Sequence, residues 1–324
     1  MNAMNLAAIT RNTEEIITEE ELTALLAEKK HPTTYCGYEV SGAVHIGTLV
    51  AVSKQKDFQE AGLKVKVLLA DVHTYLNRKG SEKWIDEMAD YWRACFIALG
   101  LTNAEFVRGT EFEYDKEYIH DVLKLGLITT LARATRSMQE VARDIENAHV
   151  SQMMYPLMQI ADIKHMGVDI AHGGMEQRKI HMLGREVLPD IGYRKPVCIH
   201  TPLLVSLQGP GCKMSSSKPE TVISVDEKPE QIAEKISKAY CPLEKEGNPV
   251  LQMSKFLIFP ATGKLEVTRP EKFGGDIIFS SYPELEDAYL SKKLHPMDLK
   301  KAVTTALTER LEPVRAAGLI MPSQ

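Results

Sequence analysis

Apolar residues in the first two-thirds of the chain form short runs that alternate with longer segments of helical spacing. The short runs, rich in aliphatic and β-branched residues, occupy 33–38, 64–72, 104–108, 168–171 and 197–200. The longer segments, where apolar positions recur every three or four residues, occupy 45–60, 82–99, 119–144, 155–165 and 174–188. Strands separated by helices are typical of a parallel sheet, so this part of the chain predicts an α/β domain.

The last third of the chain has a different pattern. Residues 229–240 and 296–317 are amphipathic with helical spacing, and each segment has a proline near its start, where a missing N–H is tolerated. Residues 247–282 mix prolines, glycines and alternating positions, and the pattern assigns no element there. We therefore expect an α/β domain at 1–220 and a smaller, mainly helical domain at 221–324.

Composition narrows the class of protein. The chain is 44% hydrophobic and 26% charged with a net charge of −5, so contact with nucleic acid has to rest on particular residues. The cysteines, Cys36, Cys95, Cys198, Cys212 and Cys241, contain no C-x-x-C pair, which favours reduced thiols over disulfides or a zinc site. The sequence shows no signal peptide and no apolar stretch of membrane length, so we expect a cytoplasmic protein with no membrane partner.

A first candidate for chemistry lies at the end of the first predicted strand. After Gly37, the chain turns through a second glycine and enters a predicted helix at His45-Ile46-Gly47. A helix N-terminus suits phosphate, His45 can donate to a phosphate oxygen, and Gly47 lets a nucleotide approach the backbone. Taken alone, a histidine after a glycine turn is more often structural.

A second candidate is the segment Lys213-Met214-Ser215-Ser216-Ser217, which follows a glycine-rich turn. A lysine supplies a compact positive charge for a departing pyrophosphate, and the serine hydroxyls and N–H groups can hold further oxygens. A solvated linker is the alternative. Because this segment occurs in one chain with the upstream His45 motif, a nucleotide site is favoured.

Three polar residues share one face of a predicted helix. Tyr155, Gln159 and Asp162 stand at positions i, i+4 and i+7 among apolar neighbours. Buried polar groups without partners cost about 1–3 kcal/mol each, and a polar ligand would supply partners. A face turned toward water explains the spacing equally well.

The two nucleotide segments resemble the HIGH and KMSKS signatures of class I aminoacyl-tRNA synthetases, which bind ATP between them during adenylate formation. The resemblance implies ATP contacts from Gly37, His45, Gly47, Thr48, Lys213, Met214, Ser215, Ser216 and Ser217. Thr48 replaces the second histidine of the family pattern, and Ser216 replaces its second lysine. Charge stabilisation is then expected from His45, Lys213 and Ser216. Mg²⁺ is expected to accompany ATP, and no metal site made of protein groups alone is visible.

Nearly the whole chain is similar to tyrosyl-tRNA synthetases of the archaeal and eukaryotic type. The matching stretches are TYCGYEVSGAVHIG, VLLADVHTYLN, YPLMQIADIKHMGVDIAHGGMEQRKIHM, GCKMSSSK, RPEKFGGD and HPMDLKKAV. The resemblance implies a Rossmann-like catalytic domain and a C-terminal anticodon-binding domain. It also implies that Tyr35 and Asp162 hold the phenol of tyrosine. The positions implied for its ammonium group are Tyr155, Gln159 and Gln177, with Glu39 nearby.

The reaction implied by this family has two steps. The tyrosine carboxylate attacks the α-phosphorus of ATP, pyrophosphate leaves, and the terminal ribose of tRNA(Tyr) then takes the tyrosyl group. A tryptophanyl-tRNA synthetase is one alternative, and the pairing of Tyr35 with Asp162 argues against it. A synthetase-like protein that binds RNA without catalysis is the other, and it would be expected to lack Lys213, Asp162 or Gln177, all of which are present.

The resemblance also implies contacts with tRNA and with a second copy of the chain. His295 and Asp298 lie in the HPMDLKK stretch, where Asp298 is expected to read the first anticodon base, a guanine, while Phe273 stacks on it. A carboxylate in the first turn of a helix is the simpler reading of Asp298. Contacts with the acceptor end are implied for Arg136, Arg178 and Lys179. A homodimer is implied, and its apolar contact is expected within 119–138.

Overall fold

A six-stranded mixed sheet forms the centre of the first two-thirds of the chain. The computed structural model describes residues 6–141, 147, 149–211, 214 and 218–324. Its strands run in the order β1-β6-β5-β2-β3-β4, and all are parallel except β1, which is antiparallel to β6. The strand bounds are β1 Glu15–Ile17, β2 Thr33–Tyr38, β3 Lys64–Leu69, β4 Glu105–Arg108, β5 Ile170–Gly174 and β6 Val197–Thr201.

The order of the strands places a crevice at one end of the sheet. From β2 the chain proceeds outward to β3 and β4, then returns to β5 on the other side of β2. In open parallel sheets, ligands bind beyond the carboxyl ends of the strands where the order reverses in this way. The reversal lies between β2 and β5, so the fold predicts a site at the ends of these two strands.

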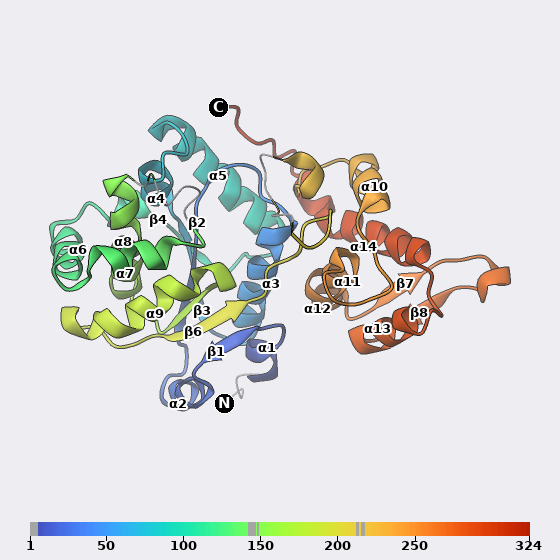
Figure 1. Cartoon of the computed structure of the whole chain (residues 1–324), viewed down its shortest axis with the longest axis horizontal. Coiled ribbons are helices and arrows are strands. Elements are labelled where there is room, and N and C mark those ends of the chain that lie inside the picture. The colour runs from blue at the N-terminus through green and yellow to red at the C-terminus, as the bar shows by residue number, and fades with distance from the viewer. Residues whose placement is uncertain (1–5, 142–146, 148, 212–213, 215–217) are drawn as a thin grey trace.

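Helices cover both faces of the sheet (Figure 1). Helix α3 follows β2 and lies between the sheet and the C-terminal helices, whereas α6, α7, α8 and α9 gather on the opposite side. The helices of this part are α1 Leu6–Thr10, α2 Glu19–Glu28, α3 Ile46–Glu60, α4 Asp71–Leu76, α5 Glu82–Ala98, α6 Lys116–Ile128, α7 Leu131–Met138, α8 Val150–His165 and α9 Arg178–Val187.

The strands and longer helices agree with the sequence pattern in their order, but several ends differ, α8 begins at Val150 and not at residue 155, and α1, α2, α4 and β1 were not expected. Strand β3 stops at Leu69 because Asp71 begins α4, where its carboxylate accepts from the N–H and hydroxyl of Thr110 at 3.1 and 2.7 Å. The expected helix at 119–144 is broken where Thr130 caps α7. Strand β1 was not expected, since three residues are too few to show a period.

The C-terminal third packs around a single long helix. Its elements are α10 Pro229–Lys238, α11 Pro249–Met253, a π-helical turn Ser254–Ile258, α12 Phe259–Thr262, β7 Leu265–Val267, β8 Ile277–Phe279, α13 Tyr282–Leu290 and α14 Pro296–Ala316. Helix α14 buries Leu299, Val303, Leu307 and Leu311, one residue per turn, against α10 and the antiparallel β7–β8 pair. The two predicted amphipathic helices are therefore confirmed. Over the described part of the chain, every helix is too short or too polar to cross a membrane.

Candidate active site

A cavity of about 280 Å³ opens where the sheet predicts a site. Strand β2, the loop after it, helices α4 and α8 and the 3₁₀ turn Met175–Gln177 supply its walls. Six of its lining residues are those assigned to a tyrosine site by the sequence: Tyr35, Glu39, Tyr155, Gln159, Asp162 and Gln177. The predicted face of α8 therefore points into a cavity and not into solvent.

On one side of the cavity, several buried polar atoms lack hydrogen-bond partners among the described residues. They include the hydroxyl of Tyr35, Oδ2 of Asp162 and both ring nitrogens of His73. The other oxygen of Asp162, Oδ1, accepts from the Tyr118 hydroxyl at 2.7 Å. Burial and the nearby Asp162 carboxylate raise the pKa of Tyr35 well above its ordinary value, so its phenol stays protonated. A ligand hydroxyl placed between them can donate to Asp162 and accept from Tyr35.

Amide and carboxylate oxygens line the other part of the cavity. Gln159 donates through Nε2 to Oε1 of Gln177 at 3.0 Å, and Oε1 of Gln159 has no partner within the described residues. The Glu39 carboxylate accepts from Asn77 at 2.7 Å and pairs with Lys79 at 3.1 Å. Such oxygens are suitable acceptors for an ammonium group.

A second cavity of about 450 Å³ adjoins the first and contains the nucleotide motif. The two cavities share five lining residues, Gly37, Tyr38, Glu140, Glu176 and Gln177. A single ligand can therefore extend from one cavity into the other. Five expected ATP contacts line the second cavity: Gly37, His45, Gly47, Thr48 and Met214. The remaining four, Lys213, Ser215, Ser216 and Ser217, lie outside the described residues.

His45 caps helix α3, and its imidazole ring is neutral. Its Nδ1 accepts from the N–H of Gly47 at 3.1 Å. Burial lowers the pKa of the imidazole to about 4, so the ring is neutral near pH 7. A neutral imidazole that accepts at Nδ1 carries its hydrogen at Nε2, which can then donate to a ligand oxygen. Gly47 is required beside it, because a Cβ there would lie 2.9 Å from Cε1 of His45 and 3.1 Å from Sδ of Met214.

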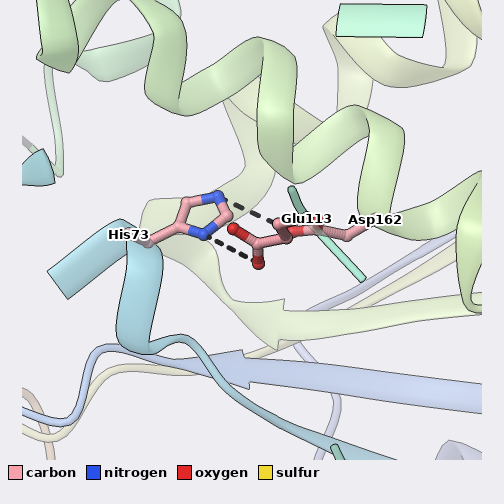
Figure 2. A group of neighbouring side chains, drawn as sticks. All are labelled: His73, Glu113 and Asp162. Carbon is pink, nitrogen blue, oxygen red and sulfur yellow. Dashed lines mark ion pairs between the residues drawn. The ribbon is translucent and has the colours of Figure 1, made fainter. Parts of the chain in front are cut away.

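The structure also brings in residues that the sequence analysis missed. Glu176 lines both cavities, and burial raises the pKa of its carboxyl group. His73 lies between Asp162 and a buried carboxylate, Glu113 (Figure 2). His73 follows the predicted strand 64–72 directly, a position typical of ligand-binding residues, and in the structure it lies in α4 four residues after β3 ends. Glu113 carries no such signal.

The residues expected at the acceptor end of tRNA lie on neighbouring helices, α7 and α9. Arg178 forms two bonds to the Glu15 carboxylate, at 2.7 and 2.9 Å, and so ties α9 to β1. Lys179 donates to Gln139 and Glu140, each at 3.0 Å. The side chain of Arg136 is exposed. Arg178 and Lys179 would therefore have to exchange or share these partners in order to meet a phosphate.

The residues expected at the anticodon lie at the far end of the C-terminal part. Phe273 lies in the loop between β7 and β8 and is 60% exposed. Arg269 in the same loop donates to the carbonyl of Lys293 at 3.1 Å, which joins the loop to the segment before α14. His295 caps α14 by accepting from the N–H of Met297 at 3.2 Å, and Asp298 lies in the first turn. The structure therefore brings the Phe273 loop and the start of α14 together.

Comparison with known proteins identifies the family. Residues 27–312 match the family described as tRNA synthetases class I (W and Y). A tyrosine--tRNA ligase of Methanopyrus kandleri is 51% identical over 96% of this chain and 97% of its own length. The crystal structure of tyrosyl-tRNA synthetase from Archaeoglobus fulgidus, complexed with L-tyrosine, has a TM-score of 0.94 and 53% identity and covers 96% of this chain and 98% of that chain.

The similarity extends to less closely related sequences. The Pyrococcus horikoshii tyrosyl-tRNA synthetase, also complexed with L-tyrosine, has a TM-score of 0.89 at 36% identity, covering 96% of this chain and 95% of that one. These matches cover nearly all of this chain and of its relatives, and together with the shared fold they identify the family. The chain belongs to the tyrosyl-tRNA synthetases of class I.

Proposed function

We propose that this chain attaches L-tyrosine to tRNA(Tyr) at the expense of ATP, through a tyrosyl-adenylate. One observation carries the proposal: the unpartnered hydroxyl of Tyr35 and Oδ2 of Asp162 lie in a cavity that continues into the cavity around His45. A phenol bound between the first two groups directs the rest of tyrosine toward the nucleotide side. Indole carries one N–H and no acceptor, so it would leave one of these two groups without a partner.

Binding of the amino-acid end rests on the oxygens at the open part of the cavity. The tyrosine ammonium group meets Tyr155 and the amide oxygens of Gln159 and Gln177, while Glu39 adds a negative charge nearby. These contacts hold the substrate carboxylate toward the second cavity. No general base is required for the first step, because a carboxylate is already the nucleophile, and the protein contributes positioning and charge stabilisation.

The nucleotide side supplies that stabilisation. The Nε2–H of His45 donates to a phosphate oxygen, and Lys213 and Ser216 bind the departing pyrophosphate. The backbone at Gly37 and Gly47 leaves room for the nucleoside, and Thr48 and Met214 line the same cavity. Mg²⁺ suits this cavity, since the carboxylates of Glu140 and Glu176 line it and hard oxygen donors bind that ion. The ion neutralises phosphate charge when it is bound.

Recognition of tRNA uses two separated surfaces. We assign residues 1–220 to catalysis and residues 221–324 to the anticodon. Arg136, Arg178 and Lys179 face the acceptor end, and the Phe273 loop with His295 and Asp298 faces the anticodon. The exposed aromatic ring of Phe273, and the bond from Arg269 that joins its loop to the segment before α14, support a stacking platform at that end.

A homodimer accounts for an exposed apolar row on α6 and α7. Ile119, Leu123 and Leu127 follow one another at four-residue intervals on α6, and Leu131 begins α7. Leu127 is 87% exposed and Leu131 is 70% exposed, which is unusual for leucines in a single soluble subunit. A second copy of the chain covers this row in the proposed dimer. We expect this enzyme to act in the cytoplasm, where tRNA and ATP are available.

Exchange of labelled pyrophosphate into ATP tests the proposal. Exchange should depend on tyrosine, and Asp162→Ala should abolish it because the phenol loses its acceptor. Asp298→Ala should leave exchange intact and impair the charging of tRNA(Tyr). Absence of exchange with tyrosine, or equal exchange with tryptophan, would refute the function. Equal loss of exchange in both variants would refute the division into two functional parts.

A further inference from the structure

His73 is enclosed between two carboxylates at the base of the proposed phenol site (Figure 2). Its Nδ1 lies 3.4 Å from Oε1 of Glu113, and its Nε2 lies 3.6 Å from Oδ2 of Asp162. The side chains of all three residues are at most 1% exposed. They come from three separate segments: α4, the turn after β4, and α8.

This arrangement favours a positive charge on the histidine, because each ring nitrogen faces a carboxylate at ion-pair distance and neither forms a hydrogen bond among the described residues. An imidazolium has a hydrogen on each ring nitrogen, so it can face two carboxylates, whereas a neutral ring would turn a lone pair toward one of them. Burial alone would lower the pKa of His73, but Glu113, Asp162 and the more distant Glu39 outweigh burial and raise the pKa to about 9. The edge-to-face contact with Tyr155, at 4.6 Å between ring centroids, keeps the ring in this orientation.

The cluster also defines which oxygen of Asp162 is available. Oδ1 is occupied by the Tyr118 hydroxyl, and Oδ2 lies between His73 and the cavity. The pKa of Asp162 lies well above its ordinary value, because burial and the Glu113 carboxylate raise it more than His73 and the Tyr118 hydroxyl lower it. The charge on His73 therefore opposes protonation of Asp162, and a protonated Oδ2 would no longer be a strong acceptor.

We propose that His73 is a positioning residue for the choice of amino acid: paired as an imidazolium with Glu113, it favours the ionised form of Asp162 and directs that carboxylate toward the substrate phenol. The inference rests on the proposed phenol site between Tyr35 and Asp162. Glu113 provides the counter-charge, and Gly109 makes room for it, since a Cβ at Gly109 would lie 2.3 Å from Oε1 of Glu113.

A metal ion is the competing occupant of this cluster. One ligand atom from each of His73, Glu113 and Asp162 can be chosen so that all lie within 4.8 Å of one another. The orientation of the ring argues against an ion, because the two nitrogens face different carboxylates and one ion would bind only one nitrogen. A bound cation would also take the Asp162 oxygen that the phenol needs.

The test compares tyrosine with phenylalanine in pyrophosphate exchange. His73→Gln preserves polarity and removes the charge, so the ratio of kcat/KM for tyrosine to that for phenylalanine should fall about tenfold or more, mainly through KM for tyrosine. Glu113→Gln should change the ratio in the same direction by a smaller factor. If both variants lose activity equally toward the two amino acids, His73 has only a structural role and the inference is wrong.

Two further measurements separate the possible failures. Asp162→Asn should by itself lower the ratio of kcat/KM for tyrosine to that for phenylalanine. If that ratio does not fall, the phenol site is misplaced. If it falls in Asp162→Asn but does not change in His73→Gln, only the role of His73 is overturned. Nitrogen-15 NMR of histidine-labelled protein, assigned with His73→Gln, should find both His73 nitrogens protonated near neutral pH. A neutral ring, or a stoichiometric transition metal in the purified protein, would also overturn the inference.

Discussion

The hydroxyl of Tyr118 on α6 donates to Oδ1 of Asp162 on α8 at 2.7 Å, across 44 residues of sequence. The same hydroxyl lies 3.0 Å from the carbonyl of Met158, one turn earlier on α8. A residue outside the cavity therefore fixes the carboxylate that the substrate phenol is proposed to meet. Because α6 also carries the exposed apolar row, the substrate site and the proposed dimer contact are attached to the same helix.

Replacing Tyr118 by phenylalanine should weaken tyrosine binding without removing the carboxylate. Oδ1 of Asp162 would be buried without its donor, so KM for tyrosine in pyrophosphate exchange should rise about tenfold, and the free energy of unfolding should fall by about 1–2 kcal/mol. Tyr289→Phe is a matched control, since its hydroxyl donates to Pro242 at 2.8 Å far from the cavity. An equal rise of KM in both variants would contradict a specific role for Tyr118.

His45→Ala should reduce activation far more than it reduces stability. Loss of the cap on α3 should cost about 1 kcal/mol of unfolding free energy. Loss of the Nε2–H donor should lower kcat for pyrophosphate exchange about a hundredfold. His295→Ala removes the same kind of cap from α14 and serves as a control for stability. Similar exchange rates in the two variants would rule out a phosphate contact by His45.

The stability of the chain should fall as the solution is acidified, in part because of His172. This ring is buried without hydrogen-bond partners among the described residues, and burial lowers its pKa well below the ordinary value. As the pH falls through about 6.5, His172 therefore becomes protonated in the unfolded chain but stays neutral in the folded chain. The free energy of unfolding then decreases as the pH is lowered further. Urea unfolding should show that the free energy of unfolding of the parent chain falls between about pH 7 and about pH 5. The fall should be about 2 kcal/mol smaller in His172→Leu.

The exposed His31 gives the matching control. His31→Leu should change the unfolding free energy by a similar amount at both pH values, because water solvates this exposed ring in the folded chain as well as in the unfolded chain. If the two leucine variants show the same dependence on pH, the acid sensitivity lies elsewhere.

Phe273→Ala should impair aminoacylation and leave activation unchanged. Stacking of one base on an aromatic ring contributes about 1–3 kcal/mol, so KM for tRNA(Tyr) should rise about tenfold or more. Ile278→Ala removes another exposed apolar side chain from the same hairpin and should have little effect. Loss of pyrophosphate exchange in Phe273→Ala would show that the loop acts on catalysis.

Leu127→Glu should convert the proposed dimer into monomers, because it places a charge in the centre of the apolar row. Light scattering should report half the mass of the parent chain at micromolar concentration. Ile320→Glu, at a residue that is 84% exposed near the C-terminus, should not change the mass. A parent chain that is itself monomeric would remove the dimer from the proposed function.

The sequence predicted those parts of the site that depend on local spacing. Tyr155, Gln159 and Asp162 share a face because a helix has 3.6 residues per turn, and the structure places that face in the cavity. His45 was expected at a helix start because glycines precede an apolar periodic segment. Both inferences need only the residues near each other along the chain.

The parts that were missed depend on contacts between distant segments. Glu113 reaches the site only because the turn after β4 packs against α4, which itself contacts α8, and nothing near Glu113 in the sequence marks a buried carboxylate. Glu176 lies in the segment 174–188 that was predicted as one helix, but in the structure it belongs to a separate 3₁₀ turn, Met175–Gln177, before α9 begins. Segment 247–282 breaks into elements of three to five residues, too short for periodicity to identify.

The position of β1 has a consequence for how the chain folds during synthesis. β1 pairs with β6, with Glu15 opposite His200, so β1 leaves the ribosome long before the strand that it pairs with. Until β6 emerges, the N-terminal segment has no partner, and until β1 docks, the open edge of β6 can pair with another chain. Contacts so distant in sequence slow folding. Chaperone binding to nascent chains should therefore persist until the segment around residue 200 has been made.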